Sequence, residues 1–160
     1  MHIYKLYYHI LSMIWKLLYK LHYGLRLRIG KNFQFRKQFT LLLDSKGVVT
    51  IGDNVFFNNF CTVCALSEII IGDGTILGEN VKLYDHNHKY FDPRIPIKQQ
   101  GYTVAPIHIG KHCWIGSNVT ILKGVTIGDN CVIGTGCVIF KDIPANSVVI
   151  NKQNLEILCK

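Results

Sequence analysis

Two histidines, His86 and His88, lie two residues apart in VKLYDHNHKYFDP, the segment that runs from Val81 to Pro93. An imidazole titrates near neutral pH, so it can act as a general base, and its neutral form also ligates metal ions. Asp85 directly precedes the pair and could orient an imidazole. By residue type alone, the segment predicts a catalytic base, a metal site or the polar content of a loop.

This segment interrupts a six-residue apolar repeat. Each repeat begins with an apolar residue, often followed by glycine: Ile29, Phe35, Ile51, Phe57, Val63, Ile71, Leu77, Leu83, Ile109, Ile115, Ile121, Ile127, Ile133 and Ile139. A period of six is wrong for an amphipathic helix and typical of a parallel β-helix, in which three repeats form one triangular coil. The spacing grows to eight after Val63 and to 26 after Leu83, which predicts an enlarged corner and then a loop. Long loops in compact repeat proteins are usually functional.

Glycine, asparagine and cysteine occupy separate positions in the repeat. Segments such as Gly52-Asp53-Asn54 suit tight corners, where we expect both Gly and Asn to supply positive φ. At the fifth position cysteine exchanges with valine, which predicts small, buried, free thiols at Cys113, Cys131 and Cys137. Cys61 and Cys64 form a CxxC without a second cluster, so we expect no zinc or redox site. Free thiols favour the reducing cytoplasm.

The excess positive charge lies in the N-terminal third. Residues 1–46 hold nine Lys or Arg and one acid, in a chain of formal net charge +8. Residues 3–23 predict a helix that ends at Gly24. Its apolar surface is interrupted by one polar stripe, made of Lys5, His9, Ser12, Lys16 and Lys20. Two interpretations stay open: packing on the protein or another subunit, and peripheral contact of residues 1–25 with an anionic membrane. No nucleic-acid motif accompanies the charge, and the lysines argue against a signal peptide or membrane span.

From Ile51 to about Asn146 the chain resembles the left-handed β-helix hexapeptide-repeat acyltransferases, especially the galactoside and maltose O-acetyltransferases and the capsule and lipopolysaccharide O-acetyltransferases. The most specific match is WIGSNVTILKGVTIGDNCVIGTGCVIFKDIP, residues 114–144. We therefore expect an all-β, left-handed parallel β-helix of about five coils. The expected parts are an N-terminal helix (1–25), a β-helix (26–146) with a protruding active-site loop (84–106), and a C-terminal tail (147–160).

The resemblance implies a cytoplasmic homotrimer that binds acetyl-CoA in the groove between neighbouring subunits and needs no metal. It places the catalytic base on His88, which would deprotonate a sugar hydroxyl for attack on the thioester. His86 and Asp85 become neighbours at the acceptor. The acceptor-binding asparagine of the family falls on Asn59. The implied cofactor contacts are Trp114, Ser117, Gly134, Thr135 and Lys141.

The chain also departs from the family. Ser67 stands where an acceptor-binding aspartate is expected, and the tail lacks the usual Gly-x-Pro with basic residues for the CoA nucleotide. Simple galactosides or maltose are therefore not implied as acceptors, and a glycan made at the inner membrane face is the hypothesis that the N-terminal charge favours. Alternative functions are N-acetylation of an amino or nucleotide sugar, a zinc-dependent hydratase on the same helix type, and a non-catalytic β-helix scaffold.

Overall fold

The structure, a computed structural model, describes residues 2–44 and 46–152, with side chains from residue 6 onward. After α1 (His2–Tyr23) and a short 3-10 turn, η1 (Gly24–Arg26), the chain winds through three parallel sheets. Sheet 1 holds β1 (Leu27–Ile29), β4 (Val48–Ile51), β7 (Glu68–Ile71), β12 (Ile107–Ile109) and β15 (Thr126–Ile127). Sheet 2 holds β2 (Gln34–Phe35), β5 (Phe56–Phe57), β8 (Ile76–Leu77), β13 (Trp114–Ile115), β16 (Val132–Ile133) and β18 (Val148–Val149). Sheet 3 holds β3 (Thr40–Leu43), β6 (Thr62–Ala65), β9 (Lys82–Tyr84), β14 (Thr120–Leu122) and β17 (Val138–Ile139).

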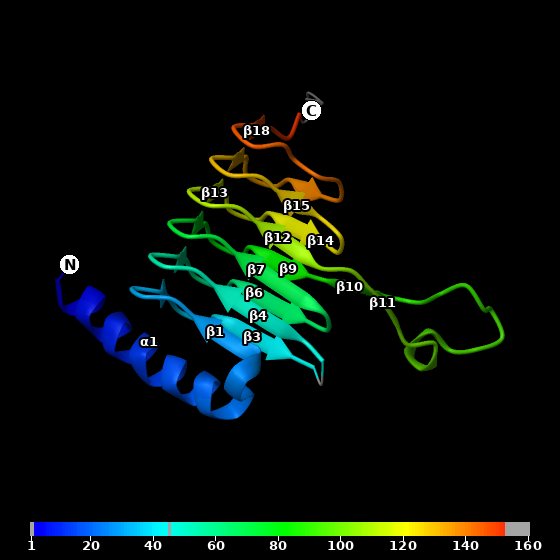
Figure 1. Ribbon diagram of the computed structural model, residues 1–160, viewed down its shortest axis with the longest axis horizontal. Coiled ribbons are helices and arrows are strands. Elements are labelled where there is room, and N and C mark those ends of the chain that lie inside the picture. Colours follow the sequence, from blue (N-terminus) through cyan, green and yellow to red (C-terminus); the bar gives the residue numbers. More distant parts are fainter. Residues whose placement is uncertain (1, 45, 153–160) are drawn as a thin grey trace, which may run out of the picture.

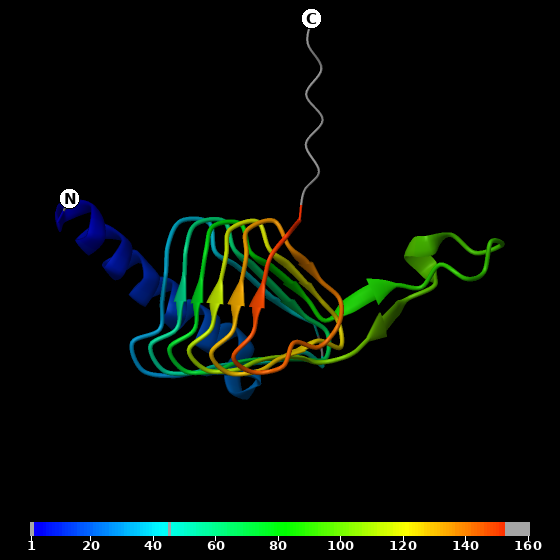
Figure 2. The same cartoon turned by 90° about the horizontal axis from the view of Figure 1, so that it is seen from above.

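The three sheets form the walls of a triangular prism, as Figure 2 shows from above. Each strand pairs in register with the equivalent strand one coil away, so that Ile51 pairs with Ile71 and Phe57 with Leu77. The apolar residue that begins each repeat points inward, and all are buried except the half-buried Ile29 at the end of the stack. Burying an Ile or Leu side chain contributes about 1.5–3 kcal/mol, which is why the six-residue pattern determines the fold. The predicted parallel β-helix of about five coils is confirmed.

Asparagine and glycine have different roles at the corners of the coils. Positive φ occurs at the asparagines, with φ of 57° at Asn54 and 59° at Asn118. The glycines that follow the leading residues do not have positive φ, so that part of the corner prediction is wrong. Gly52 is needed for a different reason, since a Cβ there would lie 2.5 Å from Asp73 Oδ1 and 2.8 Å from Asp73 N. Glycine thus allows consecutive coils to approach closely, and asparagine turns the chain.

The cysteines behave as small core residues. Cys61, Cys113, Cys131 and Cys137 are buried with free thiols, as the exchange with valine predicts for the last three. Cys64 is also free and half-buried, so the CxxC is not a disulfide. Burial raises the pKa of the Cys61 thiol to about 11. The Cys61 thiol is therefore protonated and unreactive near neutral pH.

Helix α1 covers the open end of the first coil (Figure 1). Three of its side chains donate hydrogen bonds to backbone carbonyls of that coil: Lys16 Nζ to Phe33 O (2.9 Å), Tyr19 Oη to Phe39 O (3.2 Å) and Tyr23 Oη to Leu41 O (2.9 Å). The donors are three and four residues apart, so they share one face of the helix. They satisfy acceptors that an edge strand would otherwise expose. As expected, the helix ends at Gly24, whose φ is +56°.

Between residues 27 and 152, leaving aside residue 45, the one long departure from the prism is the expected loop. After β9 the chain forms an antiparallel hairpin of β10 (His86–His88) and β11 (Tyr102–Val104), with a 3-10 turn, η2 (Ile97–Gln99), at its far end. Figures 1 and 2 both show this hairpin projecting from the edge of the prism where sheet 3 leads into sheet 1. We call this edge 3–1. The edge where sheet 2 leads into sheet 3 is called edge 2–3.

Candidate active site

His88 lies on the exposed face of the hairpin, opposite Tyr102. The two residues are Cα partners in the β10–β11 register, and their ring centroids are 4.5 Å apart at an interplanar angle of 42°. Within the described part of the chain, the His88 ring makes no hydrogen bond. Both ring nitrogens are therefore accessible to a ligand, while the contact with Tyr102 limits where the ring can turn.

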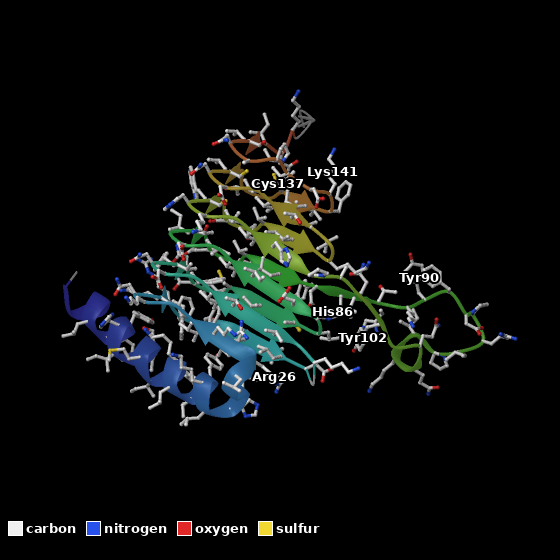
Figure 3. All side chains as sticks on the ribbon, in the orientation of Figure 1. Arg26, His86, Tyr90, Tyr102, Cys137 and Lys141 are labelled. Carbon is white, nitrogen blue, oxygen red and sulfur yellow. The ribbon has the colours of Figure 1, made fainter. Side chains whose placement is uncertain are left out.

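His86 packs against the same tyrosine but is held more firmly. Its ring centroid lies 5.3 Å from that of Tyr102, perpendicular to it, and its side chain is 15% exposed. Its Nδ1 lies 3.1 Å from Oδ1 of Asp85. Because a carboxylate only accepts hydrogen bonds, this contact places a proton on Nδ1, and in the neutral form of the ring the lone pair is then on Nε2. His86 and His88 thus share one tyrosine but have different environments. Figure 3 shows His86 and Tyr102 on the projecting hairpin.

Asp85 ties the hairpin to the preceding coil. Its carboxylate is fully buried and accepts backbone N–H bonds from Leu66 (2.8 Å) and Ser67 (2.6 Å). These residues form the enlarged corner between β6 and β7, where the six-residue spacing breaks. Asp85 is expected beside the acceptor, and in this protomer its buried carboxylate is occupied by these backbone N–H groups and by His86. We therefore interpret Asp85 as a positioning residue for His86 and for the root of the hairpin.

Most of the other expected site residues lie along edge 2–3. Asn59 donates from Nδ2 to Glu79 Oε1 (2.8 Å), one coil further along. Glu79 N then donates to Ser117 Oγ (3.2 Å), and Gly136 N donates to Ser117 O (2.9 Å). Consecutive coils therefore connect Asn59, Ser117 and the corner of the last coil into one polar ladder. Sequence spacing placed these residues on corners, and the structure shows that they share the same edge.

Trp114, Gly134 and Thr135 border this ladder. Trp114 projects from sheet 2 with 55% of its surface exposed, three residues before Ser117. Gly134 follows β16 and donates its N–H to Val149 O (2.7 Å), and Thr135 is exposed beside it. An exposed indole beside a strip of small polar residues could hold a slender chain that carries amide groups.

Lys141 belongs to the other edge. It is exposed just after β17, and Figure 3 shows it higher on the stack than His86 and Tyr102. Ser67, on the same side, has its N–H bound to Asp85. A single protomer therefore holds two half-sites: the hairpin with His86 and His88 at edge 3–1, and the ladder from Asn59 to Thr135 at edge 2–3.

Two residues that the sequence did not single out contribute to these half-sites. Tyr102 contacts both histidine rings, and Glu79 fixes the side-chain amide of Asn59. The alternating pattern of Tyr102-Thr103-Val104 could have suggested a strand that pairs with His86-Asn87-His88. Nothing in the sequence pairs Glu79 with Asn59, because their contact depends on the stacking of coils.

Among the described residues, no group of three or more His, Cys, Asp or Glu side chains is arranged to hold a metal ion. Of the other histidines, His108 lies on sheet 1, where its Nε2 is 3.2 Å from Glu68 Oε2. It lies outside both half-sites.

The sequence matches known proteins along most of its length. Residues 106–141 match the family described as the hexapeptide repeat of succinyl-transferase. Over 130 residues the chain is 31% identical to WbbJ of Escherichia coli, which is named as a lipopolysaccharide biosynthesis O-acetyl transferase; the match covers 77% of this chain and 66% of WbbJ. The chain belongs to the hexapeptide-repeat acyltransferase family.

Solved structures of this acyltransferase family share its coil. A maltose O-acetyltransferase from Clostridium difficile is 36% identical, with a TM-score of 0.67 over 76% of this chain and 63% of that one. A hexapeptide-repeat acetyltransferase from Vibrio cholerae, solved in complex with acetyl coenzyme A, is 28% identical, with a TM-score of 0.66 over 81% of this chain and 69% of that one. The chain thus spans about two thirds of the length of these three relatives and 55% of the length of a nodulation protein L from Rhizobium meliloti.

Proposed function

We propose that this protein is a cytoplasmic O-acetyltransferase that moves the acetyl group of acetyl-CoA to a sugar hydroxyl in the synthesis of a capsule, lipopolysaccharide or exopolysaccharide. Support comes from relatives named for O-acetyl transfer and from a related structure that contains acetyl coenzyme A. The observation that carries the proposal is the hairpin, which leaves an otherwise regular β-helix and presents His88 on an exposed face beside Tyr102.

In the proposed mechanism, His88 acts as the general base. A neutral ring nitrogen takes the proton of the sugar hydroxyl, and the oxygen attacks the thioester carbonyl carbon. The carbon–sulfur bond then breaks, the acetyl ester forms, and the CoA thiolate leaves and takes up a proton. Such base catalysis contributes about 10²–10⁴-fold to the rate. The lone pair that Asp85 leaves on His86 Nε2 makes His86 the rival base, and variants of each histidine distinguish them.

Ser117 and Asn59 are suited to the roles that the family resemblance implies. Ser117 Oγ accepts a hydrogen bond from Glu79 N, so the hydroxyl proton is available to donate to the oxyanion of the tetrahedral intermediate. Asn59 donates its Nδ2 to Glu79, so its Oδ1 remains available to accept from a sugar hydroxyl. Both residues belong to the same ladder, joined through Glu79.

We further propose that the complete site forms between protomers of a homotrimer. The base lies at edge 3–1 and the ladder at edge 2–3, so one protomer alone does not bring them together. In a trimer of prisms packed side by side, the hairpin of one protomer can meet the ladder of its neighbour. The donor would then lie along the ladder, bordered by Trp114, Gly134 and Thr135, with Lys141 available for an anionic group of CoA.

The experiment that tests this function is an acceptor scan with acetyl-CoA in which release of the CoA thiol is followed. The acceptors are galactose, glucose, mannose and N-acetylglucosamine glycosides, with glucosamine as the amine. Calorimetry of acetyl-CoA binding is run beside it. Thiol release with hydroxyl acceptors supports the proposal. Faster turnover with glucosamine indicates N-acetylation, and absence of acetyl-CoA binding indicates a scaffold.

A further inference from the structure

The N-terminal helix packs with its polar side inward and presents apolar side chains to solvent. Eight large apolar residues are between 47% and 73% exposed: Leu6, Tyr7, Ile10, Met13, Ile14, Leu17, Leu18 and Leu21. Their spacing of three and four residues places them on one side of α1, which we call the outer face. Several adjacent exposed apolar residues on a folded protein indicate a binding surface.

The contacts on the opposite side of α1 explain why its polar side faces the protein and its apolar side faces solvent. Ser12 is 2% exposed, and Lys16, Tyr19 and Tyr23 bind carbonyls of the first coil. The expected polar stripe therefore divides between two environments, because Ser12 and Lys16 face the prism while His9 and Lys20 are exposed. The side chain of Lys5 lies outside the described residues. Carbonyls of the first coil thus accept hydrogen bonds from the polar side, and the apolar side has no partner among the described residues of the protomer.

The place of α1 limits what could cover its outer face. The helix crosses the end of the prism beneath the first coil, and its N-terminal half projects past the edge of the coils (Figures 1 and 2). Its outer face is therefore turned away from the stacked sheets. Subunits packed beside one another, as in the proposed homotrimer, would place three such helices at the same end of the assembly. That arrangement presents one broad apolar surface instead of burying it.

Exposed positive charge gathers on α1 and the first coil. In residues 6–44 the only acidic residue is Asp44, whereas Lys20, Arg28, Lys31, Arg36 and Lys37 are all exposed cations. A groove of about 290 Å³ runs between α1 and the first coil, lined by Met13, Lys16, Leu17, Lys20, Ile29 and Gly30. It combines two ammonium groups with apolar walls directly beside the outer face. An anionic lipid headgroup, attached to acyl chains, has the complementary chemistry.

We propose that α1 is a peripheral membrane anchor, whose outer face lies in the interfacial region of an anionic bilayer while the exposed Lys20 meets lipid phosphates. No helix among the described residues is long and apolar enough to cross a membrane. An in-plane helix with an apolar face and flanking cations binds anionic lipid surfaces instead. This inference does not depend on the acetyl-transfer reaction, and it would bring the site to a lipid-linked acceptor.

The test is flotation of the full-length protein with two kinds of vesicle: pure phosphatidylcholine, and phosphatidylcholine with about one third phosphatidylglycerol. We expect binding to the anionic vesicles that weakens as salt rises, and weak binding to the neutral ones. The variant Ile10→Ser/Leu17→Ser should lower binding to anionic vesicles by about tenfold or more, since it removes two apolar anchors. Lys20→Glu should lower it by about tenfold through charge reversal.

Matched controls come from the loop. Ile95→Ser/Ile97→Ser changes two exposed apolar residues far from α1, and Lys98→Glu reverses an exposed lysine there. Both controls should bind vesicles like the unmodified protein. Light scattering of every variant gives the assembly mass, which should stay constant. Absence of vesicle binding, or equal losses in the controls, overturns the proposal. A fall in assembly mass for the α1 variants also overturns it, because the outer face is then a subunit interface.

Discussion

The carboxylate of Asp85 lies 3.1 Å from Nδ1 of His86, and it is fully buried. The same carboxylate accepts hydrogen bonds from the backbone N–H groups of Leu66 and Ser67. One side chain at the root of the hairpin therefore contacts both the His86 imidazole and the enlarged corner of the preceding coil. A break in the six-residue spacing and the candidate site are thus parts of one local structure. His88, two residues further on, is positioned by the hairpin and Tyr102 instead.

Asp85→Asn should destabilise the protein and displace the hairpin. An amide nitrogen cannot accept the N–H bonds that the carboxylate accepts, and leaving buried donors without partners costs about 1–3 kcal/mol. Urea denaturation should show a lower free energy of unfolding. Asp92→Asn is the control, because Asp92 pairs with the exposed Arg94 near the loop tip, where ion pairs contribute little. Equal stabilities of the two variants would contradict the role of Asp85.

We expect the aromatic ring of Tyr102, and not its hydroxyl group, to position the catalytic histidine. Tyr102→Phe keeps the contact with both imidazoles and should retain most of the activity, whereas Tyr102→Ala removes it. We expect Tyr102→Ala to lower kcat by about tenfold or more, because a loosely held base is misplaced in most encounters. Steady-state kinetics separate kcat from KM, and circular dichroism checks the fold. If Tyr102→Ala matched Tyr102→Phe, the tyrosine would have no positioning role.

Much of the fold could be predicted from the sequence because each repeat again places a buried apolar residue at its first position. Thirteen of the fourteen repeat-leading residues are buried, and the exception, Ile29, lies at the exposed end of the stack. The role of the glycines that follow the leading residues was predicted wrongly, whereas Gly74, Gly124 and Gly136 have the positive φ expected at corners. The constraint on the glycines that follow the leading residues is the approach of the next coil, as at Gly52, and a local pattern does not contain that distance.

The site was less predictable for the same reason. His86 and His88 were found from the sequence because they interrupt a repeat, but their different environments depend on Asp85 and Tyr102, which reach them by folding. The sequence also predicted an amphipathic α1 without its orientation. Orientation depends on the edge carbonyls of the first coil, which exist only once the coil has formed.

A site shared between protomers makes a complementation prediction. His88→Ala and Ser117→Ala should each lose activity, because one lacks the base and the other the proposed oxyanion donor. Co-expression of both subunits should restore part of the activity, since some interfaces then combine an intact hairpin with an intact ladder. The measurement is thiol release by purified mixed assemblies. Activity no greater than that of either variant alone would contradict a site built from two protomers.

The buried thiols predict a loss of stability at alkaline pH. The folded-state pKa of Cys61 is raised to about 11 by burial, above its ordinary value of 9.0. Its contribution is therefore fully present below pH 9 and is lost as pH rises through about 11, by up to about 3 kcal/mol. Cys61→Val suits the repeat position and should reduce this loss in thermal denaturation. An unchanged pH dependence in Cys61→Val would contradict the prediction.

The central claim of the proposed mechanism is that His88 is the general base. Thiol release from acetyl-CoA with the best sugar acceptor should fall by about 10²–10⁴-fold in His88→Ala, with the fold intact by circular dichroism. His108→Ala, on sheet 1 outside both half-sites, should keep full activity. His86→Ala should lose less than His88→Ala and retain a measurable rate. Full activity of His88→Ala, or a loss confined to His86→Ala, would contradict His88 as the base.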